Sequence, residues 1–371
     1  MKIAMLGHKR IPSREGGVEI VVGELSTRMA ALGHDVTCYN RRGHHVSGSG
    51  FDKSKTNEYN GVRIKTVPTV DKKGFAAVTS SAFAAIKAAF GHYDVVHFHA
   101  EGPCAMCWLP KLTGKRVIAT IHGLDWQRSK WGGFASKYIK FGEKCAAKHA
   151  DEIIVLSENV KRYFKDTYNC DTALIPNGVS KPEILNAELI NEKYSLCKDS
   201  YFLYLGRLVP EKGVEYLINA YKTLTSDKKL VIAGGSSDTS DYEQHLHEIA
   251  KDDDRIIFTG FVEGRELCEL YSNAYVYVLP SDLEGMPLSL LEAMSYGNCC
   301  LTSDIPECTE AVGEYALSFK KSDAADLADK LSMLNNNKDI VNGYKSNAQQ
   351  YICDRFNWDD VTAQTLRLYE K

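Results

Sequence analysis

Short apolar segments of strand length alternate with helical patterns along nearly the whole chain, and this alternation most constrains the fold. Most of the segments are continuous hydrophobic runs, which is typical of parallel strands covered on both faces. Helical patterns such as Val18–Leu32 and Lys137–Ala150 lie between them. The strands predicted in the first half are Lys2–Leu6, Asp35–Tyr39, Val62–Val67, Asp94–His97, Arg116–Ile121, Glu152–Leu156 and Ala173–Ile175.

A second series of strands follows the polar stretch 180–200. Its predicted strands are Tyr201–Leu205, Lys229–Ala233, Arg255–Thr259, Val276–Leu279 and Cys300–Ser303. Strand–helix repetition twice over in 371 residues predicts an α/β protein with two doubly wound, Rossmann-like domains facing a cleft. We expect an N-terminal domain at 1–178, a C-terminal domain at 179–354, and a closing helix at 355–371 that crosses back to the first domain. The hinge is expected near Asn177–Gly178.

Composition and charge exclude several classes of protein. A net charge of −3 argues against a nucleic-acid partner. The first residues lack the apolar run of a signal peptide, and the longest apolar stretch, Ala76–Phe90, is interrupted by polar residues and Lys87. Among eleven cysteines only Cys104 and Cys107 form a C-x-x-C pair. We therefore expect reduced thiols in a cytoplasmic protein.

Ligands of doubly wound sheets bind at the carboxyl ends of the strands, so the residues after each strand are the candidates. Gly16 and Gly17 open the first helix, where bare N–H groups can receive a phosphate. They are not part of a G-x-G-x-x-G fingerprint, so a dinucleotide site is not expected. His122 and Asp125 follow a later strand and are candidates for the cleft, although a capping His with a solvated Asp would leave the same pattern.

In the second domain, Gly206 and Arg207 end a strand, and Lys212 follows five residues later at a helix start. Arg supplies a planar fork and Lys a point charge, and together they make a clamp for a diphosphate. A solvated basic loop would explain either residue alone.

Two glutamates flank the predicted start of another helix in this domain. Glu284 is expected in the loop and Glu292 one to two turns into the helix, with Pro287 in its first turn. Carboxylates so separated suit two groups of hydroxyls, those of a sugar and those of a nucleoside, rather than a shared acid/base pair. Backbone N–H groups at the helix start are expected to bind a phosphate. The candidate donor-binding residues here are Gly285, Met286, Pro287, Leu288, Ser289 and Glu292.

The Gly206-Arg207…Lys212 segment and the Glu284-x7-Glu292 segment resemble those of retaining glycosyltransferases of family 4, which have the GT-B fold. Pro176–Val179 is similar to the family's interdomain segment and Phe356-x-Trp358 to the start of its closing helix. The resemblance implies a nucleotide-diphosphate sugar donor and no metal or other cofactor. It also implies that Arg207 and Lys212 stabilise the departing diphosphate.

Two segments of the N-terminal half restrict the resemblance to a smaller group of transferases. Gly16–Glu19 and Thr120–Arg128 resemble segments of bacterial rhamnosyltransferases of capsule and cell-wall polysaccharide synthesis. This implies dTDP-L-rhamnose as donor and a lipid-diphosphate-linked saccharide as acceptor. His122 would face the transferred sugar, Glu284 would bind its hydroxyls, and Asp125 would orient the acceptor hydroxyl. A UDP- or GDP-hexose transferase and a non-catalytic nucleotide-sugar-binding protein of the same fold remain alternatives.

Two charged stretches need an interpretation. Arg128–Lys148 mixes lysines with aromatic residues at helical spacing, which suits an anionic membrane surface and a peripheral location on the inner face of the plasma membrane. Aromatic residues packing on the first sheet would give the same pattern. The Asp252–Asp254 run is interpreted as a solvated loop rather than a metal site, because it lies away from the carboxyl ends of the strands.

Overall fold

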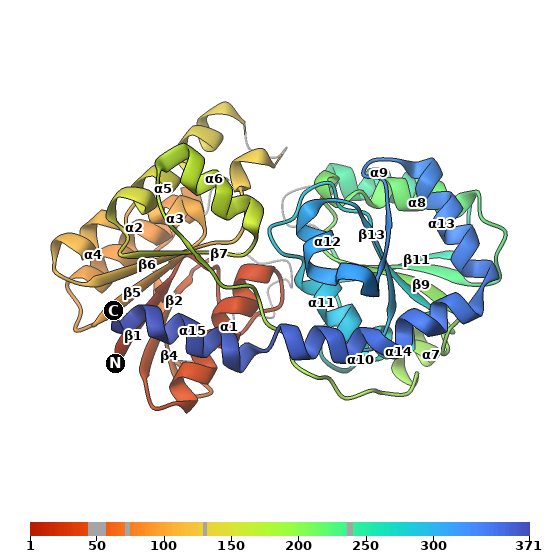
Figure 1. The fold of residues 1–371 in the computed structure, drawn as a ribbon, viewed down its shortest axis with the longest axis horizontal. Coiled ribbons are helices and arrows are strands. Elements are labelled where there is room, and N and C mark those ends of the chain that lie inside the picture. Colours follow the sequence, from red (N-terminus) through yellow and green to blue (C-terminus); the bar gives the residue numbers. More distant parts are fainter. Residues whose placement is uncertain (44–56, 71–74, 129–131, 236–239) are drawn as a thin grey trace. The chain divides into compact units, whose positions relative to one another are not determined.

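The computed structural model describes residues 1–43, 57–70, 75–128, 132–235 and 240–371. The chain divides into two compact units, one formed by residues 1–178 and 358–371 and the other by residues 179–357 (Figure 1). The last helix, α15 (Trp358–Glu370), belongs to the first unit, so it crosses back as expected. Two parallel sheets, one in each unit, confirm the α/β architecture.

The first unit is built on an eight-stranded sheet of order β3-β4-β2-β1-β5-β6-β7-β8, parallel except for β3 against β4. The residues of β1 and β5 at its centre are almost all buried, which explains their continuous apolar sequences. The strands are β1 (Lys2–Leu6), β2 (Asp35–Arg41), β3 (Glu58–Tyr59), β4 (Val62–Val67), β5 (Val95–His99), β6 (Arg116–Ile121), β7 (Glu152–Val155) and β8 (Ala173–Leu174).

Helices cover both faces of this sheet. One face carries α1 (Gly17–Ala31) and α15, which contact each other. The hydroxyl of Tyr369 in α15 lies 2.6 Å from Nδ1 of His97. Nε of Arg116 donates to the carbonyl oxygen of Leu368 at 2.8 Å. The other helices of the unit are α2 (Phe75–Ala89), α3 (Glu101–Cys104), α4 (Trp108–Leu112), α5 (Gly133–His149) and α6 (Glu158–Tyr168), with a 3-10 turn η2 (Asp125–Gln127).

The second unit is built on a six-stranded, fully parallel sheet of order β11-β10-β9-β12-β13-β14. Its strands are β9 (Tyr201–Leu205), β10 (Lys229–Ala233), β11 (Ile256–Gly260), β12 (Val276–Leu279), β13 (Cys299–Ser303) and β14 (Leu317–Phe319). Its helices are α7 (Leu189–Tyr194), α8 (Val214–Lys222), α9 (Ser240–Ala250), α10 (Gly264–Asn273), α11 (Leu288–Ser295), α12 (Pro306–Val312), α13 (Ala324–Asn336) and α14 (Lys338–Arg355), with 3-10 turns η3 (Pro210–Lys212) and η4 (Gly313–Tyr315).

The sequence did not predict every element of this unit. Strand β14 was missed because it has three residues, the middle one being the polar Ser318. The stretch 180–200, interpreted as a polar connection, contains the short helix α7. All eleven cysteines are free thiols, and seven of them are buried. Within the described part of the chain, every helix is too short or too polar to span a bilayer.

Candidate functional site

A close backbone approach joins two loops at the carboxyl edge of the second sheet. Gly213, between η3 and α8, has a φ of +64°, and a Cβ at this position would lie 2.0 Å from the carbonyl oxygen of Pro280 after β12. The N–H of Asp282 also donates to the carbonyl oxygen of Glu211 at 2.9 Å. Only glycine fits this position without strain. The loop after β9 is therefore fixed against the loop after β12.

This approach brings together two of the candidate residues. Nζ of Lys212 lies 2.5 Å from Oε1 of Glu284, and both side chains are mostly shielded from solvent. The electrostatic attraction between the two side chains is stronger there than on an open surface, because water screens it less. An ammonium group has three donors, so Lys212 can hold Glu284 and still donate to a phosphate oxygen.

Arg207 lies in the same connection between β9 and α8 as Lys212. Its backbone is fixed, because the N–H of Gly206 donates to the carbonyl oxygen of Ala233 at 3.0 Å and the hydroxyl of Tyr204 donates to the carbonyl oxygen of Arg207 at 2.9 Å. The side chain is half-exposed. The second unit therefore gathers two cations and a carboxylate at one edge of its sheet.

Helix α11 begins at Leu288, so Pro287 directly precedes the helix instead of lying in its first turn as predicted. Gly285 and Met286 lie in the loop before it, as Glu284 does. Glu292 is the fifth residue of the helix, and its Oε2 accepts from the hydroxyl of Tyr271 at 3.3 Å.

The side chain of Ser289 is also engaged in this unit. Its Oγ lies 2.8 Å from the hydroxyl of Tyr277, a tyrosine of β12. The start of α11 is thus tied to the strand behind it, with Glu284 before the helix and Glu292 inside it. The two carboxylates are separated along the helix start, as the sequence predicted.

The first unit gathers four imidazoles at the carboxyl edge of its sheet. His8 follows β1, His97 lies within β5, His99 ends β5, and His122 follows β6. The rings of His97 and His99 stack with centroids 4.2 Å apart, and Nδ1 of His99 lies 3.1 Å from Nε2 of His122. Of these four residues, only His122 was predicted from the sequence as a site residue. The alternation of His97 and His99 within one buried strand is the sequence signal of the others.

Burial keeps these imidazoles neutral. It lowers the pKa of His8 and of His122 to about 4 and that of His97 to about 3, and it holds the pKa of His99 well below its usual value. Nε2 of His99 is buried without a partner in the described structure. A buried unpaired N–H costs more than an unpaired acceptor, which favours the tautomer in which His99 carries its proton on Nδ1 and donates to His122. His122 then carries its own proton on Nδ1.

Asp125 is held by both its backbone and its side chain. Its N–H donates to the Glu101 carboxylate, with oxygen distances of 2.9 Å and 3.2 Å, and its Oδ1 lies 2.7 Å from Nε of Arg128. The Asp125 carboxylate is thus paired with a cation of its own loop. An acceptor hydroxyl at Asp125 would have to share the carboxylate with Arg128.

A buried carboxyl pair lies behind this loop. Glu101 of α3 and Glu143 of α5 are fully buried, and the hydroxyls of Tyr163 and Tyr168 donate to Glu143 at 2.9 Å and 2.8 Å. Burial, together with the charges of Asp125 and Glu143, raises the pKa of Glu101 well above its usual value. Two lone glutamates give no sequence signal of such a pair, because glutamate is usually exposed.

Gly16 and Gly17 lie at the start of α1, as expected: Gly16 precedes the helix in an extended conformation and Gly17 is its first residue. The carboxylate of Glu19 already lies at this helix end, where its Oε1 accepts from the N–H of Lys9 at 2.8 Å. A second anion would be repelled by it. This arrangement disfavours a phosphate at the Gly-Gly pair.

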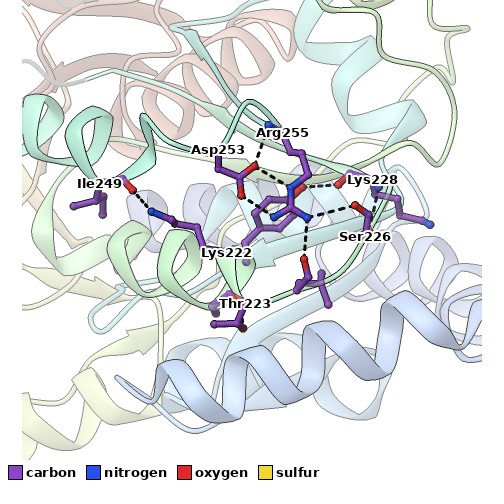
Figure 2. Close-up of polar contacts among 10 residues, drawn as sticks. Lys222, Thr223, Ser226, Lys228, Ile249, Asp253 and Arg255 are labelled. Atoms are coloured by element: carbon purple, nitrogen blue, oxygen red, sulfur yellow. Dashed lines mark hydrogen bonds and ion pairs between the residues drawn. The ribbon is translucent and has the colours of Figure 1, made fainter.

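The acidic run at 252–254 has a structural partner. Figure 2 shows the Arg255 guanidinium against the Asp253 carboxylate, with Nε at 2.9 Å and Nη2 at 2.7 Å. Nη1 of Arg255 also donates to the carbonyl oxygen of Leu224 at 2.8 Å. The hydrogen bond from Arg255 lowers the pKa of Asp253. Among the residues that the structure describes, no group of three or more His, Cys, Asp or Glu side chains is arranged to hold a metal ion.

Two family descriptions match adjacent parts of the chain: Glycosyltransferase Family 4 at residues 15–181 and Glycosyl transferases group 1 at residues 186–351. An uncharacterized glycosyltransferase of Methanocaldococcus jannaschii is 27% identical over 100% of this chain and 98% of its own. The O-antigen chain mannosyltransferase of Salmonella typhimurium is 28% identical over 60% of this chain and 63% of its own. The UDP-Gal:alpha-D-GlcNAc-diphosphoundecaprenol alpha-1,3-galactosyltransferase of Escherichia coli is 30% identical over 57% and 58%.

Solved structures match over nearly the whole chain. Sucrose-phosphate synthase from Thermosynechococcus elongatus has a TM-score of 0.82 at 22% identity, covering 100% of this chain and 98% of its own. HepE of Anabaena, in complex with UDP and glucose, has a TM-score of 0.80 at 16% identity, covering 99% and 98%. These likenesses, with the two parallel sheets, confirm the GT-B fold.

Proposed function

Because this protein is a glycosyltransferase with a family 4 domain followed by a group 1 domain, we propose that it moves a sugar from a nucleotide-diphosphate donor to a lipid-linked or oligosaccharide acceptor, with retention of configuration. The observation that carries the proposal is the fixed loop pair of the second unit, which sets Lys212 against Glu284 beside Arg207. Two cations and a carboxylate at the carboxyl edge of a parallel sheet suit a diphosphate and the hydroxyls of a sugar.

Arg207 and Lys212 stabilise the negative charge that grows on the diphosphate as the sugar leaves. Such stabilisation by fixed charges is often a large part of catalysis. The proposal includes no metal ion and no other cofactor, because these cations neutralise the diphosphate themselves. The departing phosphate accepts the proton of the acceptor hydroxyl.

Glu284 accepts hydrogen bonds from hydroxyls of the transferred sugar, and Glu292 accepts them from the ribose or deoxyribose of the donor. The N–H groups of the loop and first turn around α11 donate to the phosphates, which the helix dipole favours. The residues of this binding segment are Gly285, Met286, Pro287, Leu288 and Ser289, with Gly206 after β9.

In the first unit, His122 serves the transferred sugar and Asp125 the acceptor hydroxyl. A neutral His122 with its proton on Nδ1 is a hydrogen-bond donor to a sugar oxygen. Gly16 and Gly17 contribute to donor binding only if the donor contacts their backbone with a group other than a phosphate, because a phosphate there would lie beside Glu19.

L-rhamnose from dTDP-L-rhamnose is the donor implied by the resemblance in Gly16–Glu19 and Thr120–Arg128. A UDP- or GDP-hexose is the second candidate, and the names of relatives favour it: one is a galactosyltransferase that uses UDP-Gal and another a mannosyltransferase. The galactosyltransferase's name also includes a sugar on diphosphoundecaprenol, which supports a lipid-diphosphate-linked acceptor.

The proposed location is cytoplasmic, at the inner face of the plasma membrane, with α5 as a contact. Phe134 and Phe141 of α5 are exposed, and so are its lysines. Lys140 is partly engaged, because its Nζ lies 3.8 Å from the ring centroid of Trp126. Residues 129–131 of the Arg128–Lys148 stretch lie outside the described residues. The exposed lysines are Lys137, Lys140, Lys144 and Lys148.

A panel of labelled dTDP-L-rhamnose, UDP-hexoses and GDP-mannose, run against a synthetic polyprenyl-diphosphate saccharide, tests the proposal and chooses the donor. Arg207→Ala and Lys212→Ala should each lower kcat about 10²-fold or more, because each removes charge stabilisation. The matched control is Lys251→Ala. Lys251 is an exposed lysine that follows α9 and pairs with Glu248 of that helix. Full turnover by both site variants, or activity abolished by EDTA, would contradict the mechanism.

A further inference from the structure

Helix α2 buries its small residues and exposes its large ones. Its buried positions are all alanine or serine, whereas its phenylalanines and its isoleucine lie in solvent. The exposed fractions are 61% for Phe75, 42% for Phe83, 43% for Ile86 and 75% for Phe90, the residue that directly follows the helix. The buried residues are Ser80, Ser81, Ala84, Ala85, Ala88 and Ala89.

These large side chains form one stripe. At about 100° per residue, Phe75, Phe83, Ile86 and Phe90 fall within an arc of roughly 80°, and the buried alanines all lie outside this arc. Helix α4 packs beside α2 and adds Trp108 and Leu112, which are 37% and 76% exposed. Single exposed apolar residues are ordinary, but a contiguous apolar surface marks an interaction site. We call these six side chains the α2–α4 face.

The charges on the two helices of this face are basic. Neither α2 nor α4 contains an acidic residue. Lys87 lies beside the stripe, and Lys111 of α4 pairs with Asp151. A cavity of about 540 Å³ opens at the C-terminal end of α2, and its lining includes Lys2, Lys65 and Lys87 together with Phe90 of the face. The one carboxylate in this lining, Asp35, pairs with Arg63, so the lining carries a net positive charge.

We propose that the α2–α4 face inserts into the surface of a bilayer that contains anionic phospholipid, with the lysines around the cavity beside the lipid headgroups. Helix α2 is about 22 Å long at 1.5 Å per residue, so it lies in the interface and does not span the membrane. Apolar stripes with flanking cations bind such surfaces by burying apolar area and by electrostatic attraction.

A second copy of the chain fits this face less well. A symmetric dimer would bring the same patch of both copies together. Lys87 of each copy would then meet a face whose two helices carry no carboxylate to pair with it. The inference deepens the membrane part of the proposed function but rests on residues of α2 and α4, not of α5.

Co-sedimentation with vesicles tests the proposal. Wild type and Phe83→Ser/Phe90→Ser are compared on phosphatidylcholine vesicles with and without about 30% phosphatidylglycerol. Loss of two apolar rings should lower partitioning to the anionic vesicles about tenfold or more. The matched control is Leu32→Ser/Ile340→Ser, which replaces apolar side chains that are 64% and 38% exposed outside α2 and α4. The control should sediment like wild type.

A second measurement locates the contact. Brominated phosphatidylcholine in the anionic vesicles should quench the emission of Trp108, and Trp108→Phe should remove that part of the quenching. Anionic-vesicle binding by Phe83→Ser/Phe90→Ser equal to that of the control would overturn the proposal. So would a wild-type dimer that this variant converts to a monomer while vesicle binding stays the same.

The proposed function is tested separately on the same proteins. Donor binding measured without vesicles should be equal in wild type and in Phe83→Ser/Phe90→Ser, because neither residue belongs to the donor site. Absence of donor binding in wild type would count against the glycosyltransferase mechanism and leave the vesicle result standing. Loss of vesicle binding with donor binding intact supports the α2–α4 face.

Discussion

Mild acid should unfold the first unit before the second. His8, His97, His99 and His122 are held neutral in the folded first unit, with a pKa of about 4 for His8 and His122 and about 3 for His97. Their pKa in the folded state lies below the unfolded value of 6.5, so above pH 6.5 these histidines do not lower the free energy of unfolding. As the pH falls from 6.5 toward the folded pKa, the unfolded state binds protons that the folded state does not, and the free energy of unfolding decreases.

The magnitude follows from the shifts. At about pH 5, a histidine whose pKa is 6.5 in the unfolded state and about 4 in the folded state lowers the free energy of unfolding by about 2 kcal/mol. His8, His97 and His122 together cost about 6 kcal/mol, which is comparable to the total stability of a domain. For a unit of this size the melting temperature should fall by about 10–20 °C. Glu101 opposes the change, because its raised pKa lets the folded state gain a proton as the pH falls.

The distribution of tryptophans makes the assay specific. All four tryptophans, at positions 108, 126, 131 and 358, belong to the first unit, so thermal melts followed by tryptophan emission report on this unit alone. The second unit has only the exposed His245 and His247, and its calorimetric transition should shift less. Glu101→Gln removes the opposing carboxyl and should enlarge the drop. A tryptophan-reported midpoint that moves by less than about 3 °C between pH 7.5 and 5 would refute the reasoning.

Three further outcomes are expected. Gly213→Ala should destabilise the second unit by about 1–3 kcal/mol in calorimetry, since its φ is positive and its Cβ would meet the carbonyl oxygen of Pro280. Gly343→Ala, inside α14 with open space around it, should instead stabilise this unit by up to about 1 kcal/mol, because alanine favours a helix interior over glycine. Glu292→Gln should raise the KM for donor about tenfold with little change in kcat, and a fall in kcat alone would contradict the binding role. Tyr369→Phe should cost the first unit about 1 kcal/mol by tryptophan melts, and an unchanged midpoint would show that its hydrogen bond contributes nothing.

The strands and the places of the candidate residues were predictable because continuous apolar runs signal parallel strands whose carboxyl ends carry ligand-binding residues. The contact between Lys212 and Glu284 was not predictable from spacing. It depends on β9 and β12 being neighbours in the sheet, although β10 and β11 lie between them in the chain. The strand order is a tertiary property that sequence periodicity does not carry.

The exposed side chains of α2 were also not predictable from the sequence pattern. An apolar pattern normally predicts that the largest residues face the core. Here Phe83 and Phe90 face solvent, and the buried positions of α2 are all alanine or serine. The burial of Glu101 and Glu143 was likewise invisible, since each depends on partners from other helices.

The return of α15 to the first unit sets an order of events during synthesis. Residues 1–178 emerge from the ribosome before 179–357, yet they lack the helix that packs against α1 and β6 until the whole of 179–357 has been made. Until then His97 has no Tyr369 and Arg116 no carbonyl oxygen of Leu368. The second unit is continuous in sequence and can finish folding earlier. Although nascent domains usually mature in the order of synthesis, the unit that contains residues 1–178 is completed only after the unit formed by 179–357.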